Sequence, residues 1–295
     1  MKILSGLLAS AALALHLPAA PGASQPSAAP PLRLAEVPRD LSEAAVQWAD
    51  PAPGKRVPQV SMGWECSEVH HLLQLPRDWR PGRLHPVLVE YPGNLYDDGH
   101  GNVCSGLPAS CTLGQGLSAG EGLIWVSLPF IEERAGQWVN APRWWGDETQ
   151  TRNYCMATVR EVCARYGGDP KRLFIGGFSR GSIAANRIGL MDEEIASLWR
   201  GFICHSHYDG SRRWPQDGGA PAIAARLARL RGRAQWISHE IDPKATAFWE
   251  RLDPRAGRFT KVALPFAEHS AAWVLCDLPQ RQQLRHWFAR LCAEP

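Results

Sequence analysis

The segment from Lys171 to Asn186 constrains the fold more than any other part of the chain. An apolar run at residues 173–175 leads into a Gly-x-Ser-x-Gly pattern at Gly177–Gly181, and small residues typical of a closely packed helix follow. A strand, a sharp turn and a helix in this order lift a serine hydroxyl out of a sheet to where a base can reach it. Glycines supply the room that such a strained turn needs. The pattern makes Ser179 a candidate nucleophile, and the alternative is an ordinary glycine-rich turn with a surface serine.

The rest of the chain alternates apolar runs of strand length with stretches of helical periodicity. Strands are predicted at 69–75, 85–91, 123–128, 172–176, 202–205, 234–238 and 259–264. Helices are predicted at 149–166, 221–230, 245–252 and 278–291. This order predicts an α/β fold with a mostly parallel central sheet and helices on both faces.

The length and the net charge of the chain limit the kinds of protein that it can be. With 295 residues, 45% of them hydrophobic, and no second composition regime after the N-terminal part, we expect one catalytic domain at residues 46–295. The formal net charge of +3 is mild and the basic residues are scattered among acids, so a nucleic-acid partner is not expected.

Residues 1–23 have the pattern of a secretory signal peptide, with Lys2, an apolar run from Ile3 to Leu17, and then small residues and prolines. The run is too short to span a bilayer comfortably, so no stable membrane anchor is expected. Residues 24–45 begin with a Pro/Ala/Ser-rich stretch and are expected to be a flexible leader. The predicted location is therefore secreted or periplasmic.

Export changes the interpretation of the cysteines, because an even number in an oxidising compartment favours disulfide bonds. Cys104 with Cys111, and Cys276 with Cys292, close the most plausible loops, although the pairing cannot be deduced. No C-x-x-C pair occurs, so no metal is expected. The eight cysteines are Cys66, Cys104, Cys111, Cys155, Cys163, Cys204, Cys276 and Cys292.

A serine at such a turn needs an acid and then a histidine later in the chain. Asp242 follows the predicted strand at 234–238 and is our candidate acid; it could instead cap the next helix, with Glu240 as the substitute acid. His269 follows the last predicted strand and is the candidate general base. A near-neutral imidazole can take the serine proton and return it to the leaving group, while the carboxylate fixes its tautomer.

Several segments together resemble the α/β-hydrolase fold over about residues 60–295. They are LPRDWRPGRLHPVLVE from Leu75, YGGDPKRLFIGGFS ending at Ser179, His239–Asp242, and Glu268 with His269. Within that superfamily the chain is similar to secreted esterases of the polyhydroxybutyrate-depolymerase and feruloyl-esterase type. The resemblance implies carboxylic-ester hydrolysis through an acyl-enzyme, without a cofactor. It also implies an oxyanion hole made by the backbone N–H after the nucleophile and a second N–H from an earlier loop.

Two departures from that family bear on the oxyanion hole. The earlier loop reads Glu-Tyr-Pro-Gly-Asn up to Asn94 in place of His-Gly-Gly, so we expect the second donor at the backbone of Asn94 or a neighbour. Arg180 follows the nucleophile, and its backbone N–H can still be the first donor because that role does not depend on the side chain. Its guanidinium is expected to pair with an acid under the site or with a carboxylate on the substrate.

Other residues are candidates for the walls of the cleft. Trp144 and Trp145 precede the helix before the serine turn and could bind a flat substrate face, or simply pack in the core. In the sequence His-Ser-His-Tyr-Asp, alternate side chains of an extended segment point the same way, so His205 and His207 are expected to line the cleft. Asp209 in the same segment is an alternative acid, and the trio is a weaker candidate for a metal site.

The sequence thus predicts a secreted serine esterase with a Ser-His-Asp triad, acting on an ester substrate for which a polymeric or glycan-linked form is one option. A serine peptidase of the same fold is an alternative, since the turn chemistry is the same for amides. A non-catalytic protein that binds a glycan or polymer on this scaffold is the second alternative.

Overall fold

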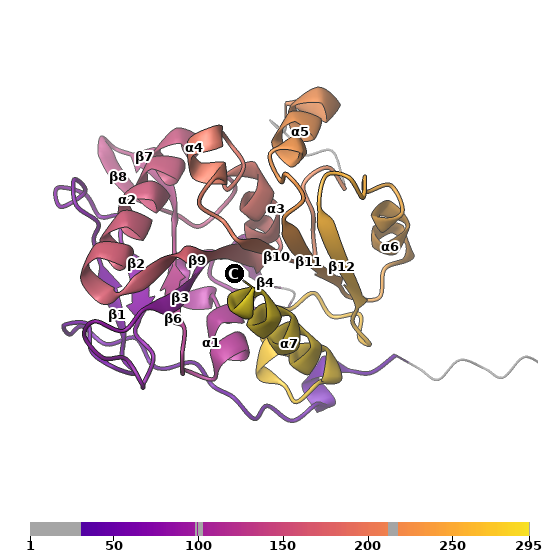
Figure 1. Ribbon diagram of the computed structural model, residues 1–295, viewed down its shortest axis with the longest axis horizontal. Helices are drawn as coiled ribbons and strands as arrows, with labels where there is room; N and C mark the ends of the chain where they lie inside the picture. The colour runs from indigo at the N-terminus through magenta and orange to yellow at the C-terminus, as the bar shows by residue number, and fades with distance from the viewer. Residues whose placement is uncertain (1–30, 98, 100–102, 212–217, 295) are drawn as a thin grey trace, which may run out of the picture. The chain divides into compact units, whose positions relative to one another are not determined.

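The computed structural model describes residues 31–97, 99, 103–211 and 218–294. The expected signal peptide at 1–23 lies outside these residues. An eight-stranded sheet runs through the described chain, in the order β1-β2-β6-β3-β9-β10-β11-β12 (Figure 1). Its strands are β1 (Arg56–Gln59), β2 (His71–Gln74), β3 (His85–Tyr91), β6 (Ile124–Ser127), β9 (Gly168–Phe178), β10 (Gly201–His205), β11 (Ala234–His239) and β12 (Arg258–Ala263).

Six neighbouring strands, from β6 to β12, pair in parallel, and only β1 and β2 are antiparallel to their neighbours. The prediction of a mostly parallel sheet is confirmed. The centre of the sheet is apolar on both faces because β3, β9 and β10 are covered on both sides, as parallel strands usually are. The carboxyl ends of these parallel strands meet at one edge of the sheet, where Ser179 follows β9.

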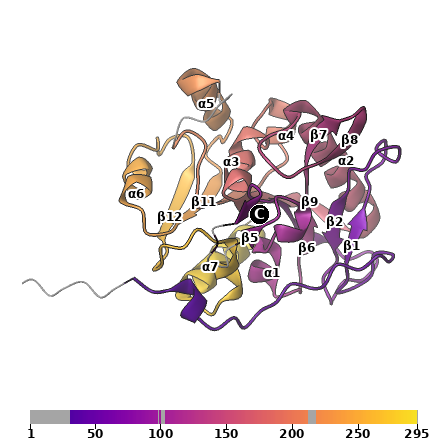
Figure 2. The ribbon, with the colours of Figure 1, turned by 180° about the vertical axis from the view of Figure 1, so that it is seen from behind.

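Helices cover the two faces in two groups (Figures 1 and 2). The helices α2, α3 and α4 lie on one side, while α1 and α7 lie on the other. The helices are α1 (Leu113–Ser118), α2 (Glu148–Tyr166), α3 (Arg180–Arg187), α4 (Glu193–Ala196), α5 (Gly219–Ala228), α6 (Pro243–Trp249) and α7 (Pro279–Ala293). Short 3-10 helices occur at η1 (Leu34–Glu36), η2 (Pro108–Ser110) and η3 (Ala271–Leu275). Helices on both faces are the expected arrangement, and this prediction is confirmed.

Each helical layer closes its own hydrophobic core against the sheet. Tyr154 and Val159 of α2 and Ile183 of α3 are buried against one face. Trp273 of η3 and Trp287 of α7 are buried against the other. The sheet is therefore a rigid platform between two packed layers, which fixes the positions of the loops at its edge.

Two small antiparallel pairs lie outside the main sheet. One joins β4 (Tyr96–Asp97) to β5 (Val103–Cys104), and the other joins β7 (Phe130–Arg134) to β8 (Gln137–Ala141). The sequence did not predict either of them, nor the short α1. A buried carboxylate organises α1: Glu90 accepts hydrogen bonds from the backbone N–H groups of Thr112, Leu113 and Gly114 at 2.9–3.2 Å.

Residues 31–45, which were expected to be part of a flexible leader, are held against the C-terminal part of the chain. Leu34 is buried, and its N–H donates to Glu268 Oε1 at 2.9 Å. Asp40 forms a two-point ion pair with Arg281, at 2.5 and 2.6 Å. Desolvation of Leu34 and a bidentate charge pair oppose the disorder that the Pro/Ala/Ser composition suggested.

The disulfide bonds expected from the even cysteine count are not formed, because all eight cysteines are free thiols. Two of the thiols donate to backbone carbonyls: Cys111 Sγ to that of Glu90 at 3.7 Å and Cys276 Sγ to that of Ala272 at 3.6 Å. Burial raises the pKa of Cys155 and Cys204 to about 12, so these two behave as small apolar groups.

Within the described residues, no helix combines the length and the apolar character needed to cross a bilayer.

Candidate active site

Ser179 lies at the turn between β9 and α3, in a backbone conformation that side-chain-bearing residues rarely adopt. Its φ is 53° and its ψ is −115°. The Ser179 N–H donates to the carbonyl of His205 at 2.9 Å, which holds the turn against the end of β10. A strained residue that the surrounding structure fixes so firmly is typical of a functional position.

The two glycines of the turn are required by close backbone approach. A Cβ atom at Gly181 would collide with the carbonyl oxygen of Tyr91, and one at Gly177 would collide with the same oxygen and with the Gly181 backbone. The turn therefore packs directly on the end of β3. No side chain fits at either position without moving the backbone that presents Ser179.

His269 and Glu240 complete a chain of hydrogen bonds that starts at Ser179. His269, in the loop between β12 and η3, has its Nε2 atom 3.1 Å from Ser179 Oγ. Its Nδ1 atom lies 3.0 Å from Oε1 of Glu240, which follows β11 directly. Glu240 is almost fully buried, whereas His269 is partly exposed. When a hydroxyl, an imidazole and a carboxylate are hydrogen-bonded in this order, the imidazole can take the proton of the hydroxyl.

The prediction that Asp242 contacts His269 is wrong. Asp242 instead begins α6: its side chain accepts a hydrogen bond from the Lys244 N–H at 2.8 Å. Pro243 occupies the first position of the helix, where proline is favoured, and Asp242 is the N-cap residue directly before it. The carboxylate against His269 is Glu240, the substitute considered from the sequence.

Ser206 is a fourth member of this network, and no sequence motif pointed to it separately. Its Oγ lies 2.8 Å from Glu240 Oε1 and 2.6 Å from His269 Nδ1. Ser206 is fully buried and has a φ of 75°, again in the left-handed region that disfavours side chains. Its hydroxyl can donate to the carboxylate while sharing the Nδ1 proton, so Ser206 helps fix both partners. The available clue was its position at the end of β10, the strand beside the one that carries Ser179.

The electrostatics keep Glu240 ionised. Burial, the largest effect, would raise the pKa of Glu240, but the hydrogen bond from His269 and the charges of the neighbouring histidines outweigh it and lower the pKa to about 2. A permanently charged carboxylate at this place holds the Nδ1 proton of His269 and leaves Nε2 free to accept the Ser179 proton.

The Arg180 guanidinium pairs with neither of its expected partners. It is buried beneath the turn and donates to four backbone carbonyls, those of Gly93, Gly106, Ala141 and Trp144, with the shortest distance 2.5 Å. It also stacks on Phe130, with Cζ 3.9 Å from the ring centroid. Burial lowers the pKa of Arg180 to about 9. Arg180 thus ties three loops together under the site and does not reach toward a substrate.

The two candidate oxyanion donors lie on segments that this arginine joins. Arg180 is the first residue of α3, so its N–H has no acceptor within the helix. Asn94 lies in the loop after β3, and its Oδ1 accepts a hydrogen bond from the Trp144 N–H at 2.7 Å. Since the Gly93 carbonyl is bound to the Arg180 guanidinium, the loop carrying Asn94 is fixed relative to the turn.

The two histidines at and after the end of β10 lie in different environments, one buried and one lining the cleft. His205 is buried, with Nδ1 3.2 Å from Ser238 Oγ and Nε2 3.1 Å from the Ser270 carbonyl. Burial lowers its pKa to about 4. The prediction that His205 binds substrate is therefore wrong; it is a neutral brace for the loop that carries His269. His207 is partly buried, and its ring centroid lies 5.2 Å from that of His269, as expected for a residue beside the cleft.

Asp209 is neither the acid nor a metal ligand in this arrangement, because its carboxylate makes two hydrogen bonds to Arg226, at 2.8 and 3.1 Å. Among the described residues, no group of three or more His, Cys, Asp or Glu side chains could hold a metal ion.

The adjacent residues Trp144 and Trp145 lie in different environments. Trp145 is 2% exposed and packs edge-on against Phe130, so the hypothesis that it binds substrate is wrong and the core-packing alternative holds. Trp144 is 45% exposed, and its backbone bridges Asn94 and Arg180. Its indole remains a candidate for substrate contact.

His269 opens onto a cavity of about 250 Å³. Phe178 and Tyr96 line it, and both rings contact His269, with centroid distances of 4.6 and 5.6 Å. A ligand in this cavity can therefore reach the His269 side chain while it contacts aromatic rings.

No model of a known protein family and no curated protein matches the sequence. Solved structures do match the fold. Esterase 2 of Thermogutta terrifontis, phosphorylated by paraoxon, has a TM-score of 0.52 and 17% identity, covering 74% of this chain and 84% of that one. The esterase Est22 has a TM-score of 0.51 and 12% identity over 81% of each chain. A carboxylesterase from Mesorhizobium loti has a TM-score of 0.50 and 13% identity, covering 79% and 98%.

The chain has the α/β-hydrolase fold. The parallel sheet, the turn after β9 and the loops after β11 and β12 are the parts that bring Ser179, Glu240 and His269 together. In a sheet of this type, ligands bind at the carboxyl ends of the strands, where these three residues lie.

Proposed function

We propose that the protein is a serine hydrolase that cleaves carboxylic esters through an acyl-enzyme, with Ser179 as nucleophile, His269 as general base and Glu240 as the acid. The observation that carries this proposal is the continuous chain from Ser179 Oγ to His269 Nε2, at 3.1 Å, and from His269 Nδ1 to Glu240 Oε1, at 3.0 Å.

In the first half of the reaction, Ser179 Oγ attacks the ester carbonyl carbon while His269 Nε2 takes the hydroxyl proton. The carbonyl oxygen becomes an oxyanion, which backbone N–H groups of Arg180 and of the Asn94 loop stabilise. When the carbon–oxygen bond of the ester breaks, His269 returns the proton to the departing alcohol. Glu240 accepts a hydrogen bond from the Nδ1–H group of His269 throughout and stabilises the imidazolium that forms.

In the second half, a water molecule attacks the carbonyl of the Ser179 ester. His269 takes a proton from the water and then returns it to Ser179 Oγ, which releases the carboxylic acid and restores the free enzyme. The proton transfers use side chains that are already in contact.

The names of the fold relatives agree with ester cleavage, since the matching structures are described as esterases and a carboxylesterase. The finer parts of the proposal rest on the sequence. Residues 1–23 support export to the periplasm or the medium, and the resemblance to polyhydroxybutyrate depolymerases and feruloyl esterases supports polyester or aromatic acyl groups as substrates.

The experiment is a hydrolysis assay of purified protein against short acyl, hydroxyalkanoate and feruloyl esters, with Ser179→Ala as the inactive partner. Ester turnover that Ser179→Ala abolishes is the expected result. A folded wild-type protein with no turnover on any of these esters, or turnover that survives Ser179→Ala, would contradict the proposal. Localisation is tested separately, by expressing the full chain and determining the N-terminus of the exported protein.

A further inference from the structure

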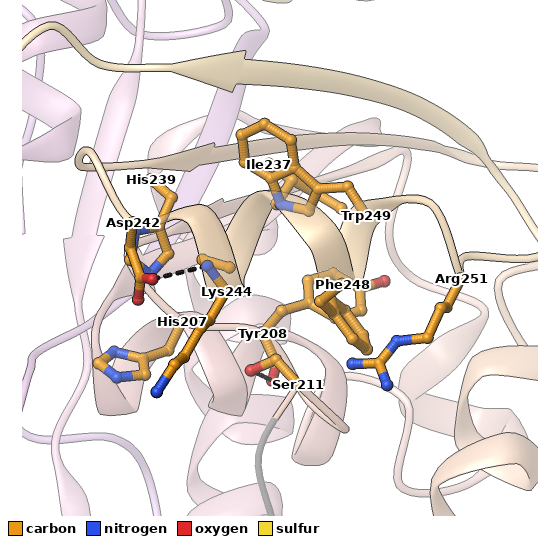
Figure 3. A pocket seen from close by; sticks show the side chains of 11 residues that line it. His207, Tyr208, Ser211, Ile237, His239, Asp242, Lys244, Phe248, Trp249 and Arg251 are labelled. Atoms are coloured by element: carbon orange, nitrogen blue, oxygen red, sulfur yellow. Dashed lines mark hydrogen bonds between the residues drawn. The ribbon is translucent and has the colours of Figure 1, made fainter.

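A second and larger cavity, of about 380 Å³, lies beside the one that contains His269. Figure 3 shows it between α6, the end of β11 and the segment after β10. The triad chemistry described above assigns no role to this space. It is large enough for one ring-sized substituent, as ligand pockets of a few hundred cubic ångströms commonly are.

The cavity begins one side chain away from the general base. His207 lines it, and the His207 ring lies 5.2 Å from the His269 ring, centroid to centroid. A group bound in the cavity is therefore close enough to belong to the same small molecule as an ester carbonyl at Ser179.

One wall of the cavity is aromatic. Phe248 and Trp249 of α6 and Tyr208 line it, and all three are at most 9% exposed. Tyr208 and Phe248 face each other at a centroid distance of 5.7 Å. Such a wall favours a flat or apolar body over a strongly hydrated one.

The rim of the cavity is cationic. Lys244 lies on α6, Arg251 lies two residues beyond the end of that helix, and both side chains line the cavity. In Figure 3 the Lys244 ammonium extends toward His207, and the Arg251 guanidinium turns toward Phe248, with Cζ 5.2 Å from the ring centroid. Within the described part of the chain, neither cation forms an ion pair with an acidic residue. The acid at this rim, Asp242, binds the backbone N–H of Lys244.

We propose that this cavity binds the part of an ester substrate that carries a carboxylate on an aromatic or apolar body. The aromatic wall buries the body, and Lys244 and Arg251 bind the carboxylate at the rim. This inference rests on the proposed ester hydrolysis and names the substrate class: esters that already bear one free carboxylate. It also makes α6 and the turn that follows it the part of the chain that decides specificity, since they contribute both cations and two of the aromatic side chains.

The test compares matched esters with and without the charge. Monomethyl terephthalate and methyl benzoate differ by one carboxylate on the acyl side, and 4-acetoxybenzoate and phenyl acetate differ by one on the alcohol side. We expect the wild-type protein to favour the charged ester of one pair, and Lys244→Gln and Arg251→Gln each to lower the charged-to-neutral ratio of kcat/KM about fivefold. The neutral ester controls for general damage to the site.

Lys171→Gln is the matched control, because Lys171 is an exposed lysine at the opposite end of β9 from Ser179. It removes the same charge and should leave the ratio unchanged. Ratios that stay the same in Lys244→Gln and Arg251→Gln, or that fall equally in Lys171→Gln, would overturn the inference while leaving ester hydrolysis intact.

A binding measurement separates the two proposals if no ester is hydrolysed. Benzoate should bind the Ser179→Ala protein, measured by ligand-observed NMR, and the double variant Lys244→Gln, Arg251→Gln should bind it at least about tenfold more weakly. Equal binding by both proteins would overturn the cavity assignment whatever the activity.

Discussion

Replacing each of two acids in the same loop tests the arrangement of the site most sharply. In Glu240→Gln, a neutral amide replaces the carboxylate that lies 3.0 Å from His269 Nδ1. The amide nitrogen can donate to Nδ1 and shift the imidazole proton to Nε2, the atom that must accept from Ser179 at 3.1 Å. In a serine protease the corresponding change lowers kcat about 10⁴-fold because it stabilises the wrong tautomer.

Ser206 moderates the expected loss. Its Oγ lies 2.6 Å from Nδ1 and can still accept a hydrogen bond from Nδ1–H, so part of the population keeps the productive tautomer. We therefore expect Glu240→Gln to lower kcat/KM about 10³-fold, which corresponds to about 4 kcal/mol of transition-state stabilisation. Asp242→Asn should change kcat/KM by less than about twofold, because Asn caps a helix as well as Asp does.

The assay is steady-state hydrolysis of one short-chain ester by both variants, with thermal unfolding to show that each is folded. A large loss in Asp242→Asn together with near-normal activity in Glu240→Gln would refute the reasoning. Similar losses in both variants, with both proteins folded, would also refute it, since only one of these acids contacts the histidine.

Three further predictions follow from the contacts around the turn. Ser206→Ala removes a charge-assisted hydrogen bond to Glu240 and should lower the free energy of unfolding by about 2 kcal/mol. Ser206→Gly also relieves the positive φ, so its loss of unfolding free energy should be about 1 kcal/mol smaller. Equal losses for the two variants in chemical denaturation would contradict this. Gly181→Ala should abolish ester turnover, because its Cβ would collide with the Tyr91 carbonyl, and normal activity would count against the turn geometry. The folded-state pKa of Glu240 is lowered from 4.5 to about 2, so its ionised form stabilises the fold above about pH 4.5. Roughly 3 kcal/mol of unfolding free energy should be lost as the pH falls from 4.5 toward 2. A wild-type protein that loses no more stability than Glu240→Gln between these pH values would refute this prediction.

The sequence was sufficient for the parts of the site that follow from backbone pattern. The strand, the glycines and the small residues around Ser179 predicted the turn, and strand order predicted where His269 would lie. Both residues follow directly from local sequence pattern, because apolar runs mark the strands and glycines mark the turn. The parallel sheet was predictable for the same reason.

The remaining site residues depended on contacts between segments far apart in the chain. Glu240 and Asp242 are two positions apart after the same strand, and only the start of α6 at Pro243 decides which one faces His269. Arg180 binds carbonyls from four positions between Gly93 and Trp144, a partner set that no local pattern reveals. Trp145 packs against Phe130 of the β7-β8 pair, and that pair was itself not predicted.

The most direct measurement of the central claim is fluorophosphonate labelling of the purified protein, followed by peptide mapping, with His269→Ala in parallel. A fluorophosphonate reacts with an activated serine, so the account predicts a single adduct on Ser179 in the wild-type protein and a strong loss of labelling in His269→Ala. A folded wild-type protein that takes no label at Ser179, or that labels at the same rate without His269, would contradict it.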